Sequence, residues 1–195
     1  MPLFILDSTQ SLGYSPAMTY DPKHTFQNLA RHNERVNREM YDVLSQLTGR
    51  ARRREVGSWF GSMHSLLNHI IICDINWLKR YRALSPESTV LTDPGLDPPN
   101  LAWDRDLHDN FTSLRDNRAY VDERIRAWFA EFSVSRYGEI FKYHDSAGNP
   151  RKAMAGEAFE FLFLHQTHHR GQISQILDNS GLPNNFADNG AYLEG

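Results

Sequence analysis

Hydrophobic residues recur at helical spacing along four long segments of the chain. This pattern predicts helices over about residues 22–47, 59–83, 106–132 and 156–179. Asp21 followed by Pro22 is typical of a helix start, and Gly49 and Gly181 stand where the first and last helices are expected to end. The second segment is apolar almost all round, which indicates a helix that is buried among the others.

The segments between these helices predict the rest of the architecture. Residues 85–105 are rich in proline and aspartate and predict a long crossover loop. Residues 137–154 hold two short runs around an Asp-Ser-Ala-Gly-Asn turn and predict a β-hairpin. We therefore expect an all-α domain over residues 21–183, a four-helix bundle with a long crossover and a short hairpin before the last helix. Residues 1–20 are expected to be an irregular lead-in, and residues 184–195 a tail on the surface.

Composition and charge narrow the classes of function. The chain has 195 residues, 40% of them hydrophobic, with a net charge of -3 and a mean hydropathy of -0.58. No apolar run approaches the ~18 residues that span a bilayer, and duplex-binding proteins usually carry a basic excess. The single cysteine excludes an intramolecular disulfide framework, and the first residues lack the basic start of a secretory leader. We therefore expect one cytoplasmic domain that binds neither membrane nor nucleic acid.

Histidines on apolar helix faces are the main candidate functional residues, because a buried polar group has a desolvation cost and needs a bonding partner or a functional role. His165 and His169 are four residues apart in the last helix and so lie on one face, one turn apart. This spacing allows two imidazoles to bind one metal ion. His168 is a near neighbour of both. A hydrogen-bonded pair of core histidines is the alternative, but three histidines within five residues of an apolar helix favour a metal site.

A metal site of this kind needs a third ligand, and His69 in the most apolar segment is the best candidate. His64 is the alternative, although its place near the helix start favours solvent exposure. The other histidines fall at helix starts, on polar faces or in the hairpin and are expected at the surface: His24, His32, His108 and His144. Three imidazole ligands suit zinc or nickel, and catalytic sites of this type leave a position open for water or substrate.

Two further polar pairs lie on apolar stripes. Asn33 and Asn37 are four residues apart in the first helix, and either support the site and its substrate or form a structural network between helices. Arg118 lies on the stripe of the third helix with Asp122 four residues on. This pair is either an intrahelical ion pair at the stripe edge or includes a buried guanidinium that binds a substrate carboxylate. Cys73, in the second helix, is expected to be a buried and inert thiol.

Two of these segments resemble motifs of a known family. Residues 165–172, His-Gln-Thr-His-His-Arg-Gly-Gln, resemble the H-x-x-x-H-R-G-Q signature of the DinB/YfiT-like superfamily of metal-dependent enzymes. Residues 60–78 look like the second-helix signature of the same superfamily. Polar pairs stand where such sequences often carry them: Asn33 and Asn37, Arg118 and Asp122. The resemblance covers about residues 22–183 and implies a four-helix bundle with a long crossover.

The resemblance also implies a site and an activity. The metal ligands it implies are His69, His165 and His169. Characterised relatives depend on low-molecular-weight thiols, so the resemblance favours a thiol-dependent S-transferase, or a related hydrolase, that acts on a small electrophilic molecule. The candidates for supporting the metal or holding the thiol or substrate are Asn33, Asn37, Arg118, Asp122 and His168. A homodimer is expected because relatives are often dimers, and a non-catalytic metal-binding module of the stress response is the alternative function.

Overall fold

The computed structural model describes residues 21–99, 101–103 and 105–186. The elements of this part of the chain are α1 (Pro22–Ser45), α2 (Gly49–Arg52), α3 (Met63–Tyr81), η1 (Pro94–Leu96), α4 (Phe111–Glu131), η2 (Val134–Arg136), β1 (Ile140–His144), β2 (Pro150–Met154) and α5 (Ala155–Asp178). The prediction of an all-α fold with a hairpin before the last helix is confirmed. None of the helices in the described ranges is both long and apolar enough to cross a lipid bilayer. The expected lead-in, residues 1–20, and most of the expected tail, residues 187–195, lie outside the described residues.

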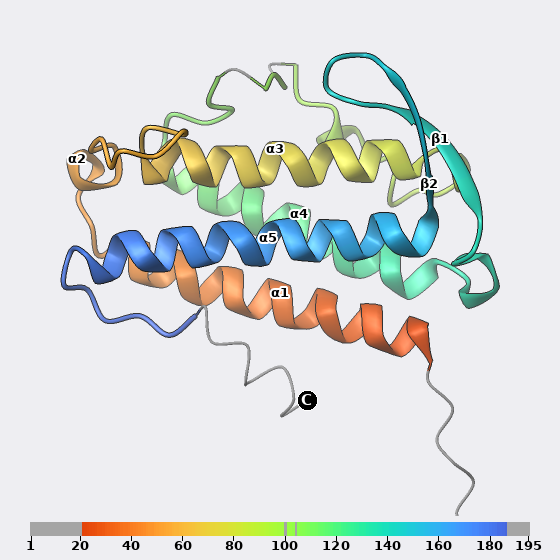
Figure 1. Cartoon of the computed structure of the whole chain (residues 1–195), viewed down its shortest axis with the longest axis horizontal. Helices are drawn as coiled ribbons and strands as arrows, with labels where there is room; N and C mark the ends of the chain where they lie inside the picture. Colours follow the sequence, from red (N-terminus) through yellow and green to blue (C-terminus); the bar gives the residue numbers. More distant parts are fainter. Residues whose placement is uncertain (1–20, 100, 104, 187–195) are drawn as a thin grey trace, which may run out of the picture.

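The long helices α1, α3, α4 and α5 lie side by side as a bundle (Figure 1). α1 packs against α4 and α5, and α3 packs against the same two helices. α3 and α4 run in the same direction along the bundle, as the colours of Figure 1 show. The chain between Tyr81 and Phe111 therefore has to return along the whole bundle, which accounts for the long crossover.

The first helical segment begins at a capping side chain but ends earlier than predicted. Asp21 accepts a hydrogen bond from the backbone N–H of Lys23 at 2.9 Å, as expected for the start of α1. The predicted stop at Gly49 is wrong in detail. α1 ends at Ser45, and Gly49 instead opens the single turn of α2, which the side chain of Thr48 caps.

Two other helices begin later than the apolar pattern predicts. α3 begins at Met63 and not near residue 59, because Ser62 caps it and Gly61, with a φ of +73°, turns the chain just before the cap. α4 begins at Phe111 and not near residue 106, because the Asn110 side chain caps its first turn. In both cases apolar residues that precede the capping residue made the predicted helix begin too early.

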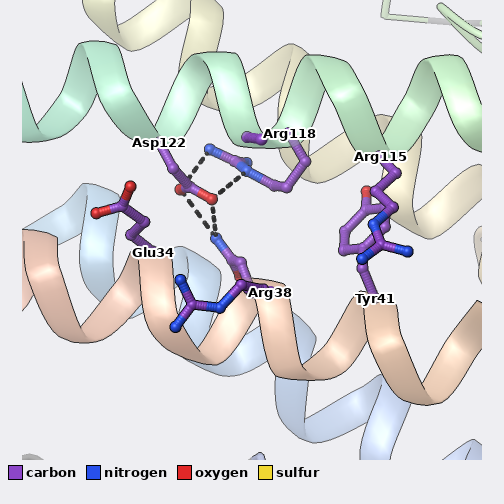
Figure 2. A pocket seen from close by; sticks show the side chains of 8 residues that line it. Glu34, Arg38, Tyr41, Arg115, Arg118 and Asp122 are labelled. Carbon is purple, nitrogen blue, oxygen red and sulfur yellow. Dashed lines mark hydrogen bonds and ion pairs between the residues drawn. The ribbon is translucent and has the colours of Figure 1, made fainter.

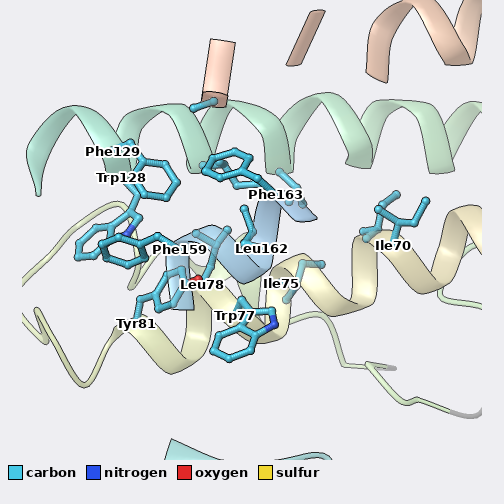
Figure 3. Packing of buried hydrophobic residues seen from close by; sticks show 14 of the residues in the cluster. Ile70, Ile75, Trp77, Leu78, Tyr81, Trp128, Phe129, Phe159, Leu162 and Phe163 are labelled. Carbon is cyan, nitrogen blue, oxygen red and sulfur yellow. The ribbon is translucent and has the colours of Figure 1, made fainter. Parts of the chain in front are cut away.

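Aromatic rings fill the end of the core where α5 begins (Figure 3). Phe159 of α5 is fully buried, and its ring centroid lies 5.0 to 6.3 Å from those of Phe26, Tyr81, Trp128, Phe129, Phe132 and Tyr137. Each of these rings meets Phe159 edge to face, an arrangement that aromatic quadrupoles favour. This packing fixes the first half of α5 against the other three long helices.

The hairpin covers one end of α3 (Figure 1). β1 and β2 pair antiparallel along their full length, and Gly148 in the connecting turn has a φ of +81°, which glycine adopts without steric cost. The ring of Tyr143 lies 5.4 Å from that of Trp77, and the ring of Phe141 lies 6.1 Å from that of Tyr81. These aromatic contacts attach the hairpin to the second half of α3.

The start of the tail departs from its expected surface position. Phe186 is only 2% exposed. Asn184 accepts a hydrogen bond from Ser174 at 2.7 Å and donates one to Asp178 at 2.9 Å. Residues 184–186 therefore fold back onto the bundle, because burying an aromatic side chain is worth more than hydrating it.

Candidate metal centre

Three histidines from two neighbouring helices meet at one point of the bundle. α3 contributes His69, and α5 contributes His165 and His169, one turn apart. The Nε2 atom of His165 lies 3.3 Å from that of His69 and 3.0 Å from that of His169. The three ligand atoms all lie within 4.8 Å of one another. Nitrogen ligands bound at ~2.0–2.1 Å to a tetrahedral zinc ion are roughly 3.4 Å apart, so this cluster could hold one divalent ion.

The surroundings of the three imidazoles keep them neutral. Burial, together with the smaller effect of the neighbouring His169, lowers the pKa of His69 to about 4 and that of His165 to about 3. Burial also lowers the pKa of His169, although its hydrogen bond with Gln172 acts in the opposite direction. A neutral imidazole keeps the lone pair that binds a metal, so no proton has to leave the site near neutral pH.

A hydrogen bond on the far side of the ring orients His169. Its Nδ1 lies 2.7 Å from Oε1 of Gln172, and because an amide oxygen only accepts, Nδ1 is assigned the hydrogen. This assignment leaves the lone pair of His169 on Nε2, which faces His165. Metal-binding histidines commonly donate their second ring N–H in this way, which fixes both the tautomer and the ring orientation.

An aromatic ring and a thiol flank the histidines. The ring centroid of Phe60 lies 4.5 Å from that of His69 and 5.3 Å from that of His169. The Sγ atom of Cys73 lies 3.4 Å from Nε2 of His69, and Cys73 is buried as expected. Burial raises the pKa of the Cys73 thiol far above its usual value, so the thiol stays protonated. Within the described chain, the cluster of candidate ligands comprises the three histidines without Cys73.

A hollow of about 560 Å³ opens beside His69. Its wall includes Trp59, Phe60, His69, Ile72, Trp103 and Arg105. The side chain of Trp59 is 88% exposed, whereas that of His69 is partly buried. A small molecule that enters the hollow from solvent can therefore contact the His69 side of the cluster.

Comparison with known proteins identifies the family of this bundle. The sequence model of the DinB family matches residues 18–195, a range that includes the three histidines and every described helix. The chain belongs to the DinB family. It is 20% identical over 166 residues to Protein DinB of Bacillus subtilis (strain 168), a match that covers 85% of this chain and 91% of that protein. No solved structure matches the chain at a significant level.

Other histidines of this DinB family chain take different places. His168 is exposed, and its ring centroid lies 4.9 Å from that of His169. The expectation of exposure is wrong for His64, which is 2% exposed. Its Nε2 bonds to the carbonyl oxygen of His108 at 2.8 Å, because the end of the crossover folds over the start of α3. The expectation is also wrong for His32, which is 9% exposed.

The predicted polar pairs of the DinB family chain meet in the core of the bundle. Arg118 of α4 donates from Nε to Oδ2 of Asp122 at 3.1 Å and from Nη2 to Oδ1 at 2.9 Å. Asn33 and Asn37 of α1 donate to the same carboxylate at 3.0 to 3.1 Å. Figure 2 shows Arg118 and Asp122 reaching from α4 toward α1. All four residues are at most 2% exposed, so the ion pair is buried rather than at the edge of the stripe.

Sequence reasoning missed Asp74, Gln166 and Arg170, which belong to the same buried network. Asp74 of α3 accepts hydrogen bonds from Arg118 at 2.5 Å and from Gln166 at 2.7 Å. Arg170 of α5 donates to Asn33 at 2.5 Å. Their position inside strongly apolar helices was a usable signal, because a buried polar side chain has to find a partner.

The buried network balances its charges. Arg118 and Arg170 stand against Asp74 and Asp122, two cations against two carboxylates. Burial raises the pKa of Asp74 to about 7 and also raises that of Asp122, while Arg118 acts to lower both. The two carboxylates in turn raise the pKa of Arg118, which stays protonated. The carboxylates that Arg118 binds in this structure are therefore supplied by the protein itself.

Proposed function

We propose that this DinB family chain is a divalent-metal-dependent enzyme. The observation that carries the proposal is the cluster of three neutral imidazoles, His69, His165 and His169, beside a hollow that opens to solvent. Zinc or nickel fits a donor set of three histidine nitrogens. Such an ion, when bound, supplies Lewis acidity, which lowers the pKa of a coordinated water or thiol.

The surrounding side chains define what the chain itself contributes. Neutral imidazoles add no negative charge, so they leave the charge of a bound divalent ion undiminished. Gln172 holds His169 in the tautomer that binds a metal. Phe60 packs over the rings of His69 and His169 and limits the access of water from that side. Cys73 is not one of the three candidate ligands, and the hollow gives small molecules access to His69, so the attacking nucleophile enters through the hollow.

The reaction that we propose is the transfer of a low-molecular-weight thiol to a small electrophilic molecule. The thiol loses its proton to solvent, its sulfur forms a bond to the electrophilic carbon, and the bond from that carbon to the leaving group breaks, so that the leaving group departs with the electron pair. A related hydrolase reaction uses the same groups, with water in place of the thiol. The hollow beside His69, at about 560 Å³, has the size of a small-molecule site. Composition and family resemblance support a cytoplasmic homodimer that does not bind nucleic acid.

We assign a positioning role to the buried network. Gln166 and Arg170 directly follow His165 and His169 in α5, and they bond to side chains of α1 and α3. Successive residues of a helix are ~100° apart, so these bonds fix the rotation of α5 about its axis. A modest rotation would carry both histidines away from His69. The network residues of α1 and α4 thus support the site by holding α5, and need not touch the substrate.

The metal content of the purified protein tests this proposal. Protein purified without chelators is expected to hold about one equivalent of zinc or nickel per chain, and His169→Ala less than about a tenth of that. His168→Ala is the matched control, because this exposed neighbour on the same helix should not affect metal content. Equal metal in His169→Ala and the wild type would contradict the proposal. A loaded protein that turns over no combination of thiol and electrophile would instead indicate a non-catalytic metal-binding module.

A further inference from the structure

A second hollow, of about 360 Å³, lies between α3, the crossover and the hairpin. Its lining includes Asn76, Lys79, Arg80, Trp103, Lys142 and Tyr143. Trp103 also lines the hollow beside His69, so the two hollows adjoin at this residue. His69, Ile72, Asn76 and Arg80 follow one another at intervals of three or four residues and so share one face of α3. The two hollows therefore follow one another along this face of α3.

Arg80 is the central cation of the second hollow. Its Cζ lies 4.7 Å from the ring centroid of Trp77, 5.2 Å from that of Tyr143 and 6.0 Å from that of Trp103. Its Nε donates to the carbonyl oxygen of His144 at 3.1 Å. In the described chain neither Nη group of Arg80 has a hydrogen-bond or ion-pair partner. Partial burial lowers the pKa of Arg80, a cost that a bound anion would offset.

Among the described residues, the other charged side chains around this hollow are already paired, with one exception. Lys79 binds Asp97 at 2.8 Å. Asp145 binds Arg151 at 3.0 Å and accepts hydrogen bonds from its own turn. Lys142 on β1 is exposed and has no partner within the described ranges. The second hollow therefore presents the uncommitted cations of Arg80 and Lys142.

We propose that the two hollows bind one extended molecule that ends in a carboxylate held by Arg80 and Lys142. This inference rests on the proposed function and adds a chemical class to its thiol or substrate. A guanidinium whose two Nη groups are both free binds a carboxylate in bidentate geometry. Arg80 follows His69 by 11 positions in α3, about 16 Å along the helix axis. Since the long arginine side chain shortens this span, a molecule roughly 10–16 Å long reaches from the histidines to the acid site.

Mercaptoalkanoic acids test this two-point binding, because they carry a thiol at one end and a carboxylate at the other. The probes are mercaptopropanoate, which is too short to span the site, mercaptoundecanoate, and the uncharged mercaptoundecanol. Calorimetry and quenching of tryptophan fluorescence measure their binding to the zinc-loaded, full-length protein. We expect mercaptoundecanoate to bind at least about 10-fold more tightly than either of the other probes. Equal affinities of the long acid and the long alcohol would overturn the inference.

Substitutions locate the acid site. Arg80→Gln is expected to weaken the binding of mercaptoundecanoate about 10-fold and to leave the binding of mercaptoundecanol unchanged, which also shows that the variant is folded. Lys142→Gln should act in the same direction. Lys152→Gln is the matched control, since Lys152 lies opposite Lys142 in the hairpin register but does not line the hollow. An equal loss of affinity for mercaptoundecanoate and mercaptoundecanol would refute the assignment. An equal loss of affinity in Lys152→Gln and Lys142→Gln would also refute it.

Undecanoate, which lacks the thiol, separates this inference from the proposed function. Binding of undecanoate to the His169→Ala protein should still depend on Arg80, because the acid site does not require the metal. If the metal proposal fails, this dependence remains measurable. If thiol probes bind the zinc-loaded protein with no dependence on Arg80, the acid site is refuted while the metal site stands.

Discussion

Removing the guanidinium of Arg118 tests whether the buried network holds the bundle together. Arg118→Met keeps most of the side-chain volume but leaves the carboxylates of Asp74 and Asp122 without their shared cation. These carboxylate residues are 1% and 2% exposed, so water replaces the lost bonds only in part. Removing one partner of a buried ion pair costs about 3–5 kcal/mol. We expect the free energy of unfolding near pH 8 to fall by about this amount.

The loss of stability in Arg118→Met should depend on pH in a defined direction. Burial already raises the pKa of Asp74 to about 7 and raises that of Asp122, and Arg118 opposes both shifts. Without Arg118 both native pKa values rise further above the ~3.9 of the unfolded chain. A carboxyl group whose pKa is raised by folding destabilises the folded state increasingly as the pH rises from its pKa in the unfolded chain to its pKa in the folded protein. Below its pKa in the unfolded chain the group is protonated in both states and does not affect stability. The cost of Arg118→Met should therefore shrink between about pH 8 and about pH 4.5.

Urea unfolding followed by circular dichroism at both pH values measures this loss. Arg115→Met is the matched control, because it makes the same substitution on the same helix. Arg115 pairs with Asp42 at the surface, where the two side chains are 45% and 56% exposed. It should therefore cost less than about 1 kcal/mol. The reasoning is refuted if Arg118→Met also costs less than about 1 kcal/mol near pH 8, or costs the same at both pH values.

Two further substitutions test the core and the metal centre separately. Phe159→Ala is expected to lower the free energy of unfolding by about 3–5 kcal/mol, because it empties the centre of the aromatic cluster. Phe161→Ala, at a position 49% exposed on the same helix, should cost far less, and urea unfolding measures both. Gln172→Ala is expected to weaken zinc affinity about 10–100-fold, because it removes the bond that orients His169. Gln175→Ala, exposed on the same helix, should leave that affinity unchanged in competition with a chromophoric chelator, and equal losses in both variants would count against the role of Gln172.

Periodicity predicted the long helices because burial of one helix face imposes a repeat of about 3.6 residues. It placed the start of α3 too early because Trp59 and Phe60 continue the apolar pattern ahead of the cap at Ser62. These two aromatic residues line the hollow beside His69 instead of extending the helix. A hydrophobic pattern alone does not distinguish a side chain that fills a core from one that lines a site.

The cluster of three histidines was predictable in part because two of its residues, His165 and His169, have a local spacing that places them on one helix face. His69 could be added because few positions in an apolar helix carry an imidazole. The buried network was less accessible to this reasoning. Arg118 is separated from Asp74 by 44 positions, and Asp74 from Gln166 by 92, so no local spacing connects them. The sequence showed only two pairs of the network that each lie within a single helix turn, Asn33 with Asn37 and Arg118 with Asp122.

α5 joins the two polar centres of the molecule. His165 and His169 face His69, while Gln166 and Arg170, one position later, bond to α1 and α3. One rotation of α5 therefore satisfies both sets, because adjacent residues point ~100° apart. A purely apolar core would be as stable or more so, since the attraction between buried charges only partly offsets their desolvation. An apolar helix, however, has several packings of similar energy, whereas ligands around one ion must be held to within about 0.5 Å. We propose that a network that bonds only at one rotation supplies this accuracy, and that this is the reason for so much buried charge next to the candidate metal ligands.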